Sequence, residues 1–307
     1  MAGRRVFVTG GSGFVGLAVI DELVTRGYQV NALVNRRKLD RDDVQSIEGG
    51  LFNDRALDAG VRDAEAVLHI VGIIMERPSK GITFQRMHVE GTRRVVDAAK
   101  RNGVKRYVHM SALGTRPSAV SDYHKTKFRA EEYVRGSGLD WTIFRPSFIH
   151  GPRGEFMQMQ AKWARGKAPP FLFMPYFGAG VMGRGGAGNL QPVYVGDVAL
   201  AFVDAIEKPQ TVGEVYPLGG QDVVSWPQMH HIVSKAIVGR ERAAVALPAW
   251  YAKAITHVVP GPLLPFNRDQ VIMSQEDNTC DLAKFVSDFG WTPRAFEETV
   301  KSYANAL

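Results

Sequence analysis

The sequence predicts an α/β fold, a doubly wound parallel sheet followed by a smaller, mostly helical C-terminal region. Short apolar runs typical of buried strands recur through the first half of the chain, at residues 6–9, 29–34, 66–71, 106–111 and 141–145. Helical patterns separate these runs, and a set of regularly spaced glycines follows the first of them. Strands that alternate with helices in this way predict a parallel sheet with helices on both faces.

Three helices are expected among these strands. Apolar residues recur at helical spacing over residues 14–26, 83–101 and 122–137. Gly27 ends the first pattern, Gly103 lies just past the second, and Gly136 and Gly138 end the third, as glycines at helix C-termini do. Farther along, we expect a helix over 156–165, a strand over 191–198 that returns to the sheet, a helix ending at residue 207 and a short strand over 214–217.

An uncharged stretch covers residues 168–183 and is dominated by Pro, Phe, Met and Gly. Its prolines and glycines exclude a long helix. Because so apolar a loop needs cover, we interpret it as a lid or wall of a substrate pocket rather than free surface, with plain core packing as the alternative. Later in the chain, Ser225 and Gln228 form a predicted capping box for a helix through Val238.

Composition indicates a globular protein with a sizeable core. The chain has 307 residues, 45% of them hydrophobic, and a formal net charge of +7. The single cysteine, Cys280, excludes an internal disulfide. No charge-free stretch reaches the roughly 20 apolar residues of a membrane helix, and the first strand begins too near Met1 for a signal peptide. We therefore expect a cytoplasmic protein, with a place at the inner face of the membrane as an alternative.

The positive charge does not by itself identify a partner. No nucleic-acid motif with interleaved aromatic residues occurs, so we expect no nucleic acid. No metal site is expected either. The sequence shows no metal-ligand spacing, and the adjacent His230 and His231 would point in different directions on a predicted helix.

The segment after the first strand has the form of a phosphate site for a dinucleotide. Gly10, Gly13 and Gly16 stand at a spacing of three on a strand-to-helix turn. A side chain at Gly10 would obstruct the turn, one at Gly13 would block a pyrophosphate, and one at Gly16 would push the helix from the strand. Backbone N–H groups and the positive end of the helix would then face the anion.

The end of the second strand favours NADP(H) over NAD(H). NAD sites usually carry an acidic residue about 20 residues past the glycines, whereas this chain reads Asn35, Arg36, Arg37 and Lys38 there. Guanidinium groups bind phosphate in bidentate fashion, so we expect this cluster to hold the 2′-phosphate. A solvated basic loop is the alternative.

Three residues near the ends of later strands form a candidate catalytic set. Ser111 ends a strand, and Tyr123 and Lys127 lie four residues apart on the following helix, so they share a face. Ser111 can donate a hydrogen bond to a carbonyl, and Tyr123 can deliver a proton. The Lys127 ammonium, with the charge of an oxidised nicotinamide, is expected to lower the pKa of Tyr123 toward the working range.

With these motifs, the chain resembles the short-chain dehydrogenase/reductase superfamily, of extended or atypical type, over nearly its whole length. The matching residues are Ser111, Tyr123 and Lys127 and those of the segments 9–16, 145–152, 191–198 and 289–293. Residues 69–73, 87–92 and 109–114 look like the subgroup that includes the 39 kDa accessory subunit of respiratory complex I and a fungal protein of ubiquinone biosynthesis. The resemblance implies a Rossmann-type nucleotide-binding domain at 1–150 and 190–215, and a substrate-binding region at 151–189 and 216–307.

The resemblance also implies which residues hold the cofactor, namely Thr9, Gly10, Ser12, Gly13, Phe14, Val15, Gly16, Asn35, Arg36, Arg37, Leu51, Val71, Gly72, Ile73, Lys127, Pro146 and Phe148. Two positions depart from the family. Gly50 stands where many relatives have an Asp that contacts adenine, so the backbone around Leu51 is expected to serve instead. His88 stands where many relatives have Asn, and we interpret it as a packing residue, with a proton shuttle as the alternative.

Three functions follow, in order of preference. The first is an NADPH-dependent reductase acting on a carbonyl of an apolar, quinone- or lipid-like substrate. The second is a cofactor-loaded scaffold that contacts a membrane or a membrane complex, because Trp250, Tyr251, Ile255 and Val258 fall near one helical face with Lys253 and His257 elsewhere. The third is a nucleotide-sugar epimerase or dehydratase, a class whose members generally retain NAD.

Overall fold

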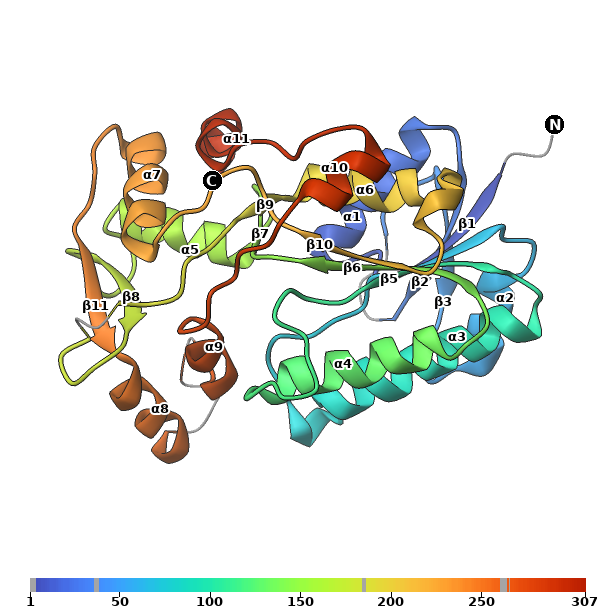
Figure 1. Cartoon of the computed structure of the whole chain (residues 1–307), viewed down its shortest axis with the longest axis horizontal. Coiled ribbons are helices and arrows are strands. Elements are labelled where there is room, and N and C mark those ends of the chain that lie inside the picture. The colour runs from blue at the N-terminus through green and yellow to red at the C-terminus, as the bar shows by residue number, and fades with distance from the viewer. Residues whose placement is uncertain (1–3, 36–38, 184–185, 260–263, 265) are drawn as a thin grey trace. The chain divides into compact units, whose positions relative to one another are not determined.

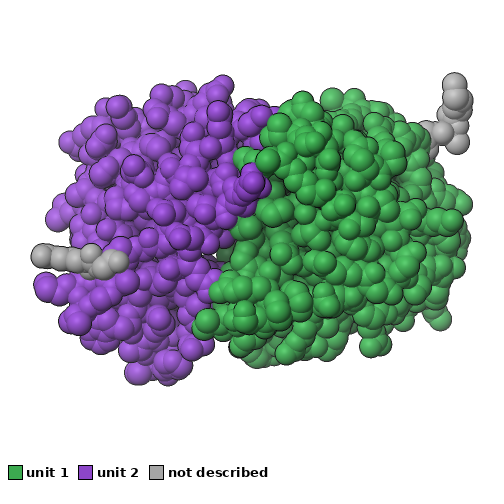
Figure 2. Space-filling model, in the orientation of Figure 1, with its two compact units in different colours: residues 1–146, 195–218, 282–291 green, residues 147–194, 219–281, 292–307 purple. Residues whose placement is uncertain are grey.

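The computed structural model describes residues 4–35, 39–183, 186–259, 264 and 266–307. The chain divides into two compact units, which Figure 2 colours separately. Unit 1 comprises Met1–Pro146, Val195–Leu218 and Leu282–Trp291, and unit 2 comprises Ser147–Tyr194, Gly219–Asp281 and Thr292–Leu307. Residues 282–291 therefore join unit 1 and not the substrate-binding region, because helix α10 (Ala283–Phe289) packs on strand β10 (Glu214–Leu218).

Unit 1 is built on a seven-stranded sheet in which all neighbouring strands are parallel. The spatial order is β10-β6-β5-β4-β1-β2-β3. The strands are β1 (Arg5–Thr9), β2 (Gln29–Val34), β3 (Val44–Glu48), β4 (Ala66–His69), β5 (Arg106–Met110), β6 (Asp140–Pro146) and β10. The order reverses between β1 and β4, which is where doubly wound sheets bind ligands. The predicted Rossmann-type fold is confirmed.

Helices cover both faces of this sheet (Figure 1). On one face α1 (Phe14–Thr25) packs against α6 (Val195–Glu207), and on the other α3 (Gly91–Arg101) packs against α2 (Asp54–Val61) and α4 (Asp122–Arg135). The sequence did not reveal β3 or α2. Only Val44 of β3 is buried, so this edge strand lacks the apolar run that identified the others.

The helix expected over 83–101 has two parts. Gln85–Glu90 form a π-helical segment (η2), and α3 continues from Gly91. Because such a segment widens the helical turn, the side chains on either side of it are rotated relative to a plain α-helix. His88 of η2 lies in the interior of unit 1. The remaining short helices are the 3₁₀ turns η1 (Pro78–Lys80), η3 (Pro209–Thr211) and η5 (Ala304–Ala306).

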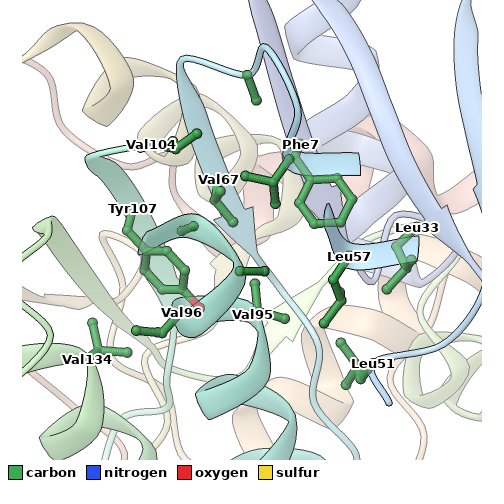
Figure 3. Close-up of a cluster of buried hydrophobic side chains, with 14 of the residues drawn as sticks. Phe7, Leu33, Leu51, Leu57, Val67, Val95, Val96, Val104, Tyr107 and Val134 are labelled. Atoms are coloured by element: carbon green, nitrogen blue, oxygen red, sulfur yellow. The ribbon is translucent and has the colours of Figure 1, made fainter. Parts of the chain in front are cut away.

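An apolar core lies between the sheet and helices α2 and α3 (Figure 3). Phe7, Leu57, Val67 and Val95 of this core have no exposed surface. A Cβ at Gly60 would lie 2.2 Å from the Phe7 ring, so only glycine allows α2 to approach β1 this closely. Close packing here holds β1, and with it the glycine turn, in a defined position.

The strand expected over residues 191–198 is wrong. Only β9 (Val193–Tyr194) forms, and it pairs with β7 (Ile149–His150) of unit 2 and not with the seven-stranded sheet. The chain becomes helical at Val195, where α6 carries Asp197 in its first turn, a position that stabilises a helix N-terminus. The preceding Pro192 has no N–H to donate, which keeps the strand short.

Unit 2 is mostly helical, with β7, β8 (Met174–Gly178), β9 and β11 (Ala244–Pro248) in two two-stranded sheets. Its helices are α5 (Glu155–Ala164), α7 (Trp226–Val238), α8 (Ala249–Val258), α9 (Arg268–Met273) and α11 (Phe296–Tyr303). The capping box of Ser225 and Gln228 is confirmed at the start of α7. No helix in the described part of the chain is long and apolar enough to cross a membrane.

The uncharged stretch 168–183 contains β8, against which α5 and α7 pack. Its two ends are exposed, at Phe171 and Leu172 before the strand and at Val181 and Met182 after it. The expectation that the whole stretch is covered is therefore wrong, because these helices pack on the strand while its flanking residues extend into solvent.

Helix α8 turns an apolar side toward solvent. Trp250, Tyr251 and Val258 are exposed, and the buried side is formed by Ala249 and Ala252. The sequence placed Ile255 with the exposed apolar residues and His257 away from them. In the structure Ile255 is half-buried and His257 is exposed.

Candidate cofactor and catalytic site

The glycine turn of unit 1 has the geometry that a dinucleotide phosphate requires. Gly10 has a φ of 79°, a conformation that favours glycine, and the Gly13 amide donates to the Gly10 carbonyl at 3.0 Å. A Cβ at Gly16 would lie 2.1 Å from the Gly10 carbonyl oxygen. Any larger residue at Gly16 would therefore push α1 away from the turn.

The N-terminus of α1 is open to an anion. The helix begins at Phe14 with no side-chain cap and no acidic residue in its first turn. Its first N–H groups have no partner within the helix, and a negative charge is what a helix N-terminus favours. Gly13 is exposed, and Ser12 and Phe14 are half-buried. These residues fit a bound pyrophosphate.

Three of the residues expected to hold the cofactor point into unit 1. The Thr9 hydroxyl lies 2.6 Å from His69 Nδ1, Val15 is buried, and Leu51 packs in the core beneath α3. Their side chains therefore support the site from beneath and do not line it.

Asn35 and Gly50 lie against each other at the ends of β2 and β3. Asn35 is exposed, and a Cβ at Gly50 would lie 3.2 Å from Asn35 Nδ2. A side chain at Gly50 would lie against the end of the exposed Asn35 side chain, which can move aside, so the structure gives no steric reason for glycine here. Arg36 and Arg37, with Lys38, lie outside the described residues, so their contact with a 2′-phosphate stays a prediction.

Lys127 is the buried cation of the site. Its Nζ donates to the Met110 carbonyl at 2.9 Å and to the Val71 carbonyl at 3.5 Å. A Cβ at Gly72 would lie 3.1 Å from Nζ, so the ammonium lies directly beneath the segment 71–73. Burial lowers the pKa of Lys127 to about 8, and the charge of Glu131 opposes that shift. The structure thus places Lys127 at the carboxyl ends of β4 and β5, together with Val71 and Gly72.

Tyr123 precedes Lys127 by one turn of α4 and is held by aromatic neighbours. Its ring meets the rings of His88 and Phe84 edge-on, with centroids 5.3 and 5.8 Å away. Burial raises the pKa of Tyr123 to about 12. The expected lowering of this pKa is therefore wrong for the protein chain, in which the Lys127 ammonium binds backbone carbonyls instead. At neutral pH Tyr123 is a protonated phenol.

Ser111 follows Met110, whose carbonyl accepts from Lys127. The Ser111 amide donates to the Phe144 carbonyl at 2.8 Å, and its hydroxyl lies 3.4 Å from that of Thr115. Pro146 ends the neighbouring strand β6 and is buried. Phe148 belongs to unit 2, where it packs against Phe156, so its contact with a cofactor stays a prediction.

His88 joins α4 to the segment after β4. Its Nδ1 lies 2.9 Å from the Thr126 hydroxyl, which itself donates to the Asp122 carbonyl, and its Nε2 lies 3.2 Å from the Ile73 amide. Nε2 lies equally far, 3.2 Å, from the Ile73 carbonyl, so it accepts from the Ile73 amide in one neutral tautomer and donates to the carbonyl in the other. Burial and the charge of Lys127 lower the pKa of His88 to about 2. These facts favour the packing role over a proton shuttle.

A buried polar row beneath the site was not identified from the sequence. Thr9, His69 and His109 stand in register on β1, β4 and β5. His69 lies 3.0 Å from the Thr92 hydroxyl and stacks on His109 at 5.4 Å. Burial lowers the pKa of both histidines, so both are neutral at pH 7. The sequence offered one indication of this row, because a polar residue stands near the end of each of these otherwise apolar strands.

Glu131, one turn beyond Lys127, was also missed. Its carboxylate has no exposed surface and accepts from Arg145 Nε at 2.8 Å and Nη2 at 2.6 Å. Arg145 lies on β6, so this bidentate pair ties α4 to the sheet. The spacing of four residues between Lys127 and Glu131 could have indicated that Glu131 lies on the same helical face as Lys127. Within the described residues, no cluster of three or more His, Cys, Asp or Glu is placed to hold a metal ion.

Comparison with known proteins adds to this geometry. Residues 10–162 match a family model described as NAD(P)H-binding. The chain is 25% identical over 304 residues to the mitochondrial NADH-ubiquinone oxidoreductase 40 kDa subunit of Neurospora crassa, covering 95% of this chain and 76% of that protein. It is 33% identical over 151 residues to a ceramide reductase of Caulobacter vibrioides, covering 48% and 47% of the two chains.

A solved structure with the same fold is UDP-glucose 4-epimerase from Thermotoga maritima, with a TM-score of 0.74, 21% identity and 98% of each chain covered. The family match over 10–162 includes the glycine turn, Ser111, Tyr123 and Lys127. The chain therefore contains an NAD(P)-binding domain, is homologous to the 40 kDa subunit of NADH-ubiquinone oxidoreductase and shares its fold with UDP-glucose 4-epimerase, as the resemblance to short-chain dehydrogenases/reductases implied.

Proposed function

We propose that this protein is an NADPH-dependent reductase that acts on a carbonyl of an apolar, quinone- or lipid-like substrate. The observation that carries this proposal is the buried Lys127 ammonium, held by the Met110 and Val71 carbonyls beneath Gly72. A cation that costs desolvation is retained where its charge is used. Tyr123 stands one helical turn from it, and Ser111 follows the carbonyl that it binds.

The roles of the residues follow from their protonation states. The bound cofactor supplies the hydride. Tyr123, whose pKa lies at about 12, is protonated at neutral pH and donates its proton to the carbonyl oxygen. Ser111 donates a hydrogen bond to the same oxygen. Lys127, whose ammonium is held by the Met110 and Val71 carbonyls, would hold the cofactor beside Gly72.

Two observations support an apolar substrate and NADPH. Strand β8, the buried or half-buried part of the 168–183 stretch, carries no charged residue, and the Caulobacter vibrioides relative is a ceramide reductase, an enzyme named for a lipid. For the cofactor, the sequence after β2 offers Arg36 and Arg37 in place of the acidic residue typical of NAD sites.

The test uses two tyrosines of the same helix. With NADPH and a panel of quinones and lipid ketones, we expect cofactor oxidation by the wild type and a loss of about 100-fold in rate for Tyr123→Phe. Tyr133→Phe is the matched control, because Tyr133 also lies on α4 but its hydroxyl donates to Asp97 at the surface. Calorimetry should show tighter binding of NADPH than NADH. Equal rates for Tyr123→Phe and the wild type would contradict the mechanism.

A second candidate is a cofactor-loaded accessory protein without turnover. It is favoured by the identity to the 40 kDa subunit of NADH-ubiquinone oxidoreductase, which extends over 95% of this chain. Under this alternative NADPH binds and raises the melting temperature, no substrate of the panel is reduced, and Tyr123→Phe leaves NADPH binding unchanged. The epimerase alternative predicts tighter binding of NAD than of NADPH.

A further inference from the structure

Unit 2 exposes an unusual number of large apolar side chains. Leu172 and Val181 are each 81% exposed, Val258 is 83% exposed and Trp250 is 56% exposed. Phe171, Met182 and Tyr251 are exposed as well. These seven residues are named the apolar strip below. Large contiguous apolar patches on soluble proteins mark sites of interaction with proteins or membranes.

The apolar strip is continuous along strand β11. At the start of β11, the Arg242 guanidinium donates to the Phe171 carbonyl, and at the start of α8 the Trp250 indole donates to the Val181 carbonyl at 3.0 Å. Between these points Val245 and Leu247 are exposed along the strand. The strand therefore connects the two exposed ends of the 168–183 stretch.

Helix α8 extends the strip. At about 100° per residue, Trp250, Tyr251 and Val258 fall within roughly one third of the circumference of the helix. The buried side carries Ala249 and Ala252, which pack in a small cluster with Phe177 and Phe266. An ordinary surface helix turns its large apolar residues inward, so α8 has the reverse arrangement.

The two chain segments that contain the strip carry only basic charged residues. Residues 156–194 and 242–268 contain seven Lys or Arg and no Asp or Glu. The whole chain has 38 basic and 31 acidic residues, so the rest of the chain is balanced, with 31 of each. The net charge of +7 is therefore concentrated in the two segments that contain the strip. Lys162, Lys167 and Arg268 among them are exposed.

We propose that the apolar strip docks on an anionic lipid bilayer. Exposed Trp and Tyr beside aliphatic side chains match the interfacial region of a bilayer, and each Lys or Arg near an anionic surface adds attraction. A protein partner of ordinary composition offers no reason for acidic residues to be absent over two whole segments. The proposal does not depend on catalysis, because it concerns only residues of unit 2.

The experiment is flotation of the full-length protein with vesicles. We expect the wild type to float with phosphatidylcholine vesicles containing about 30% phosphatidylglycerol and to stay behind with phosphatidylcholine alone. Raising the salt from about 0.05 M to about 0.5 M should reduce flotation, because it screens the cationic contribution. The double variant Trp250→Ser/Val258→Ser should bind at least about tenfold more weakly, as should Lys167→Glu/Lys253→Glu.

The matched control is Val223→Ser, which removes an apolar side chain of unit 2 that is 56% exposed but lies outside the strip. It should float like the wild type. Melting temperatures and NADPH binding check that each variant is folded. If the folded wild type stays in the lipid-free fraction at low salt, or if the Trp250/Val258 variant floats as well as Val223→Ser, the proposal fails. Either result would leave the strip to a protein partner.

Discussion

The two units of the chain bury their apolar residues to different degrees. Unit 1 places Phe7, Val67 and Val95 entirely inside its core, around a sheet of seven parallel strands. Unit 2 forms only two-stranded sheets and leaves Leu172 and Trp250 in solvent. The regular unit therefore provides a closely packed core that positions the candidate site, whereas the irregular unit leaves apolar surface exposed.

The first prediction compares the two regions directly. Phe7→Ala should lower the free energy of unfolding by about 3–5 kcal/mol, because it leaves a cavity between β1 and α2. Trp250→Ser should lower it by about 1 kcal/mol or less, since that side chain is more than half exposed and loses one hydrogen bond, to the Val181 carbonyl. Urea denaturation of both variants measures the difference. Comparable losses for the two would mean that the strip is part of a core.

The second prediction concerns the ion pair that ties α4 to the sheet. Glu131→Gln should cost about 3 kcal/mol, because it leaves the partly buried Arg145 without its carboxylate partner. The neighbouring Glu132→Gln is the control, since Glu132 is exposed and its contact with Arg135 spans 3.7 Å; its cost should be about 0.5 kcal/mol or less. The measurement is the midpoint of urea denaturation for each variant. Equal midpoints would mean that the Glu131–Arg145 pair does not anchor α4 to the sheet.

The third prediction is a pH dependence. Burial lowers the pKa of Lys127 to about 8, so its ammonium is present below that pH and is lost above it. The rate of reduction should then fall about tenfold per pH unit above pH 8. Tyr123, with its pKa at about 12, does not titrate in this range.

Two variants assign that pH limb. Lys127→Arg should remove it, because a guanidinium stays protonated. Glu131→Gln should move it to lower pH, because the Glu131 charge raises the pKa of Lys127. A limb at the same pH in Lys127→Arg would assign it to another group.

The sequence predicted unit 1 far better than unit 2. Strands 29–34 and 106–110 and helix α4 were found because their apolar periodicity is local and needs no partner to be recognised. Strand β3 was missed because an edge strand buries little, and the strand expected at 191–198 was wrong because its pairing depends on β7, more than 40 residues away in the chain. Glu131 was missed because its partner Arg145 lies on another element.

Local spacing along the chain was enough to predict the dinucleotide-binding fold and its glycine turn, which the structure confirms, whereas the roles of Ser111, Tyr123 and Lys127 stay a prediction. Such spacing follows from the periods of helices and strands, which act over a few residues. Only the folded chain shows the buried surroundings of Tyr123 and Lys127, and the contacts of His88 with Thr126 and Ile73. It also shows that the apolar strip of unit 2 is exposed. Burial and charge depend on which distant segments meet, and no local pattern specifies that.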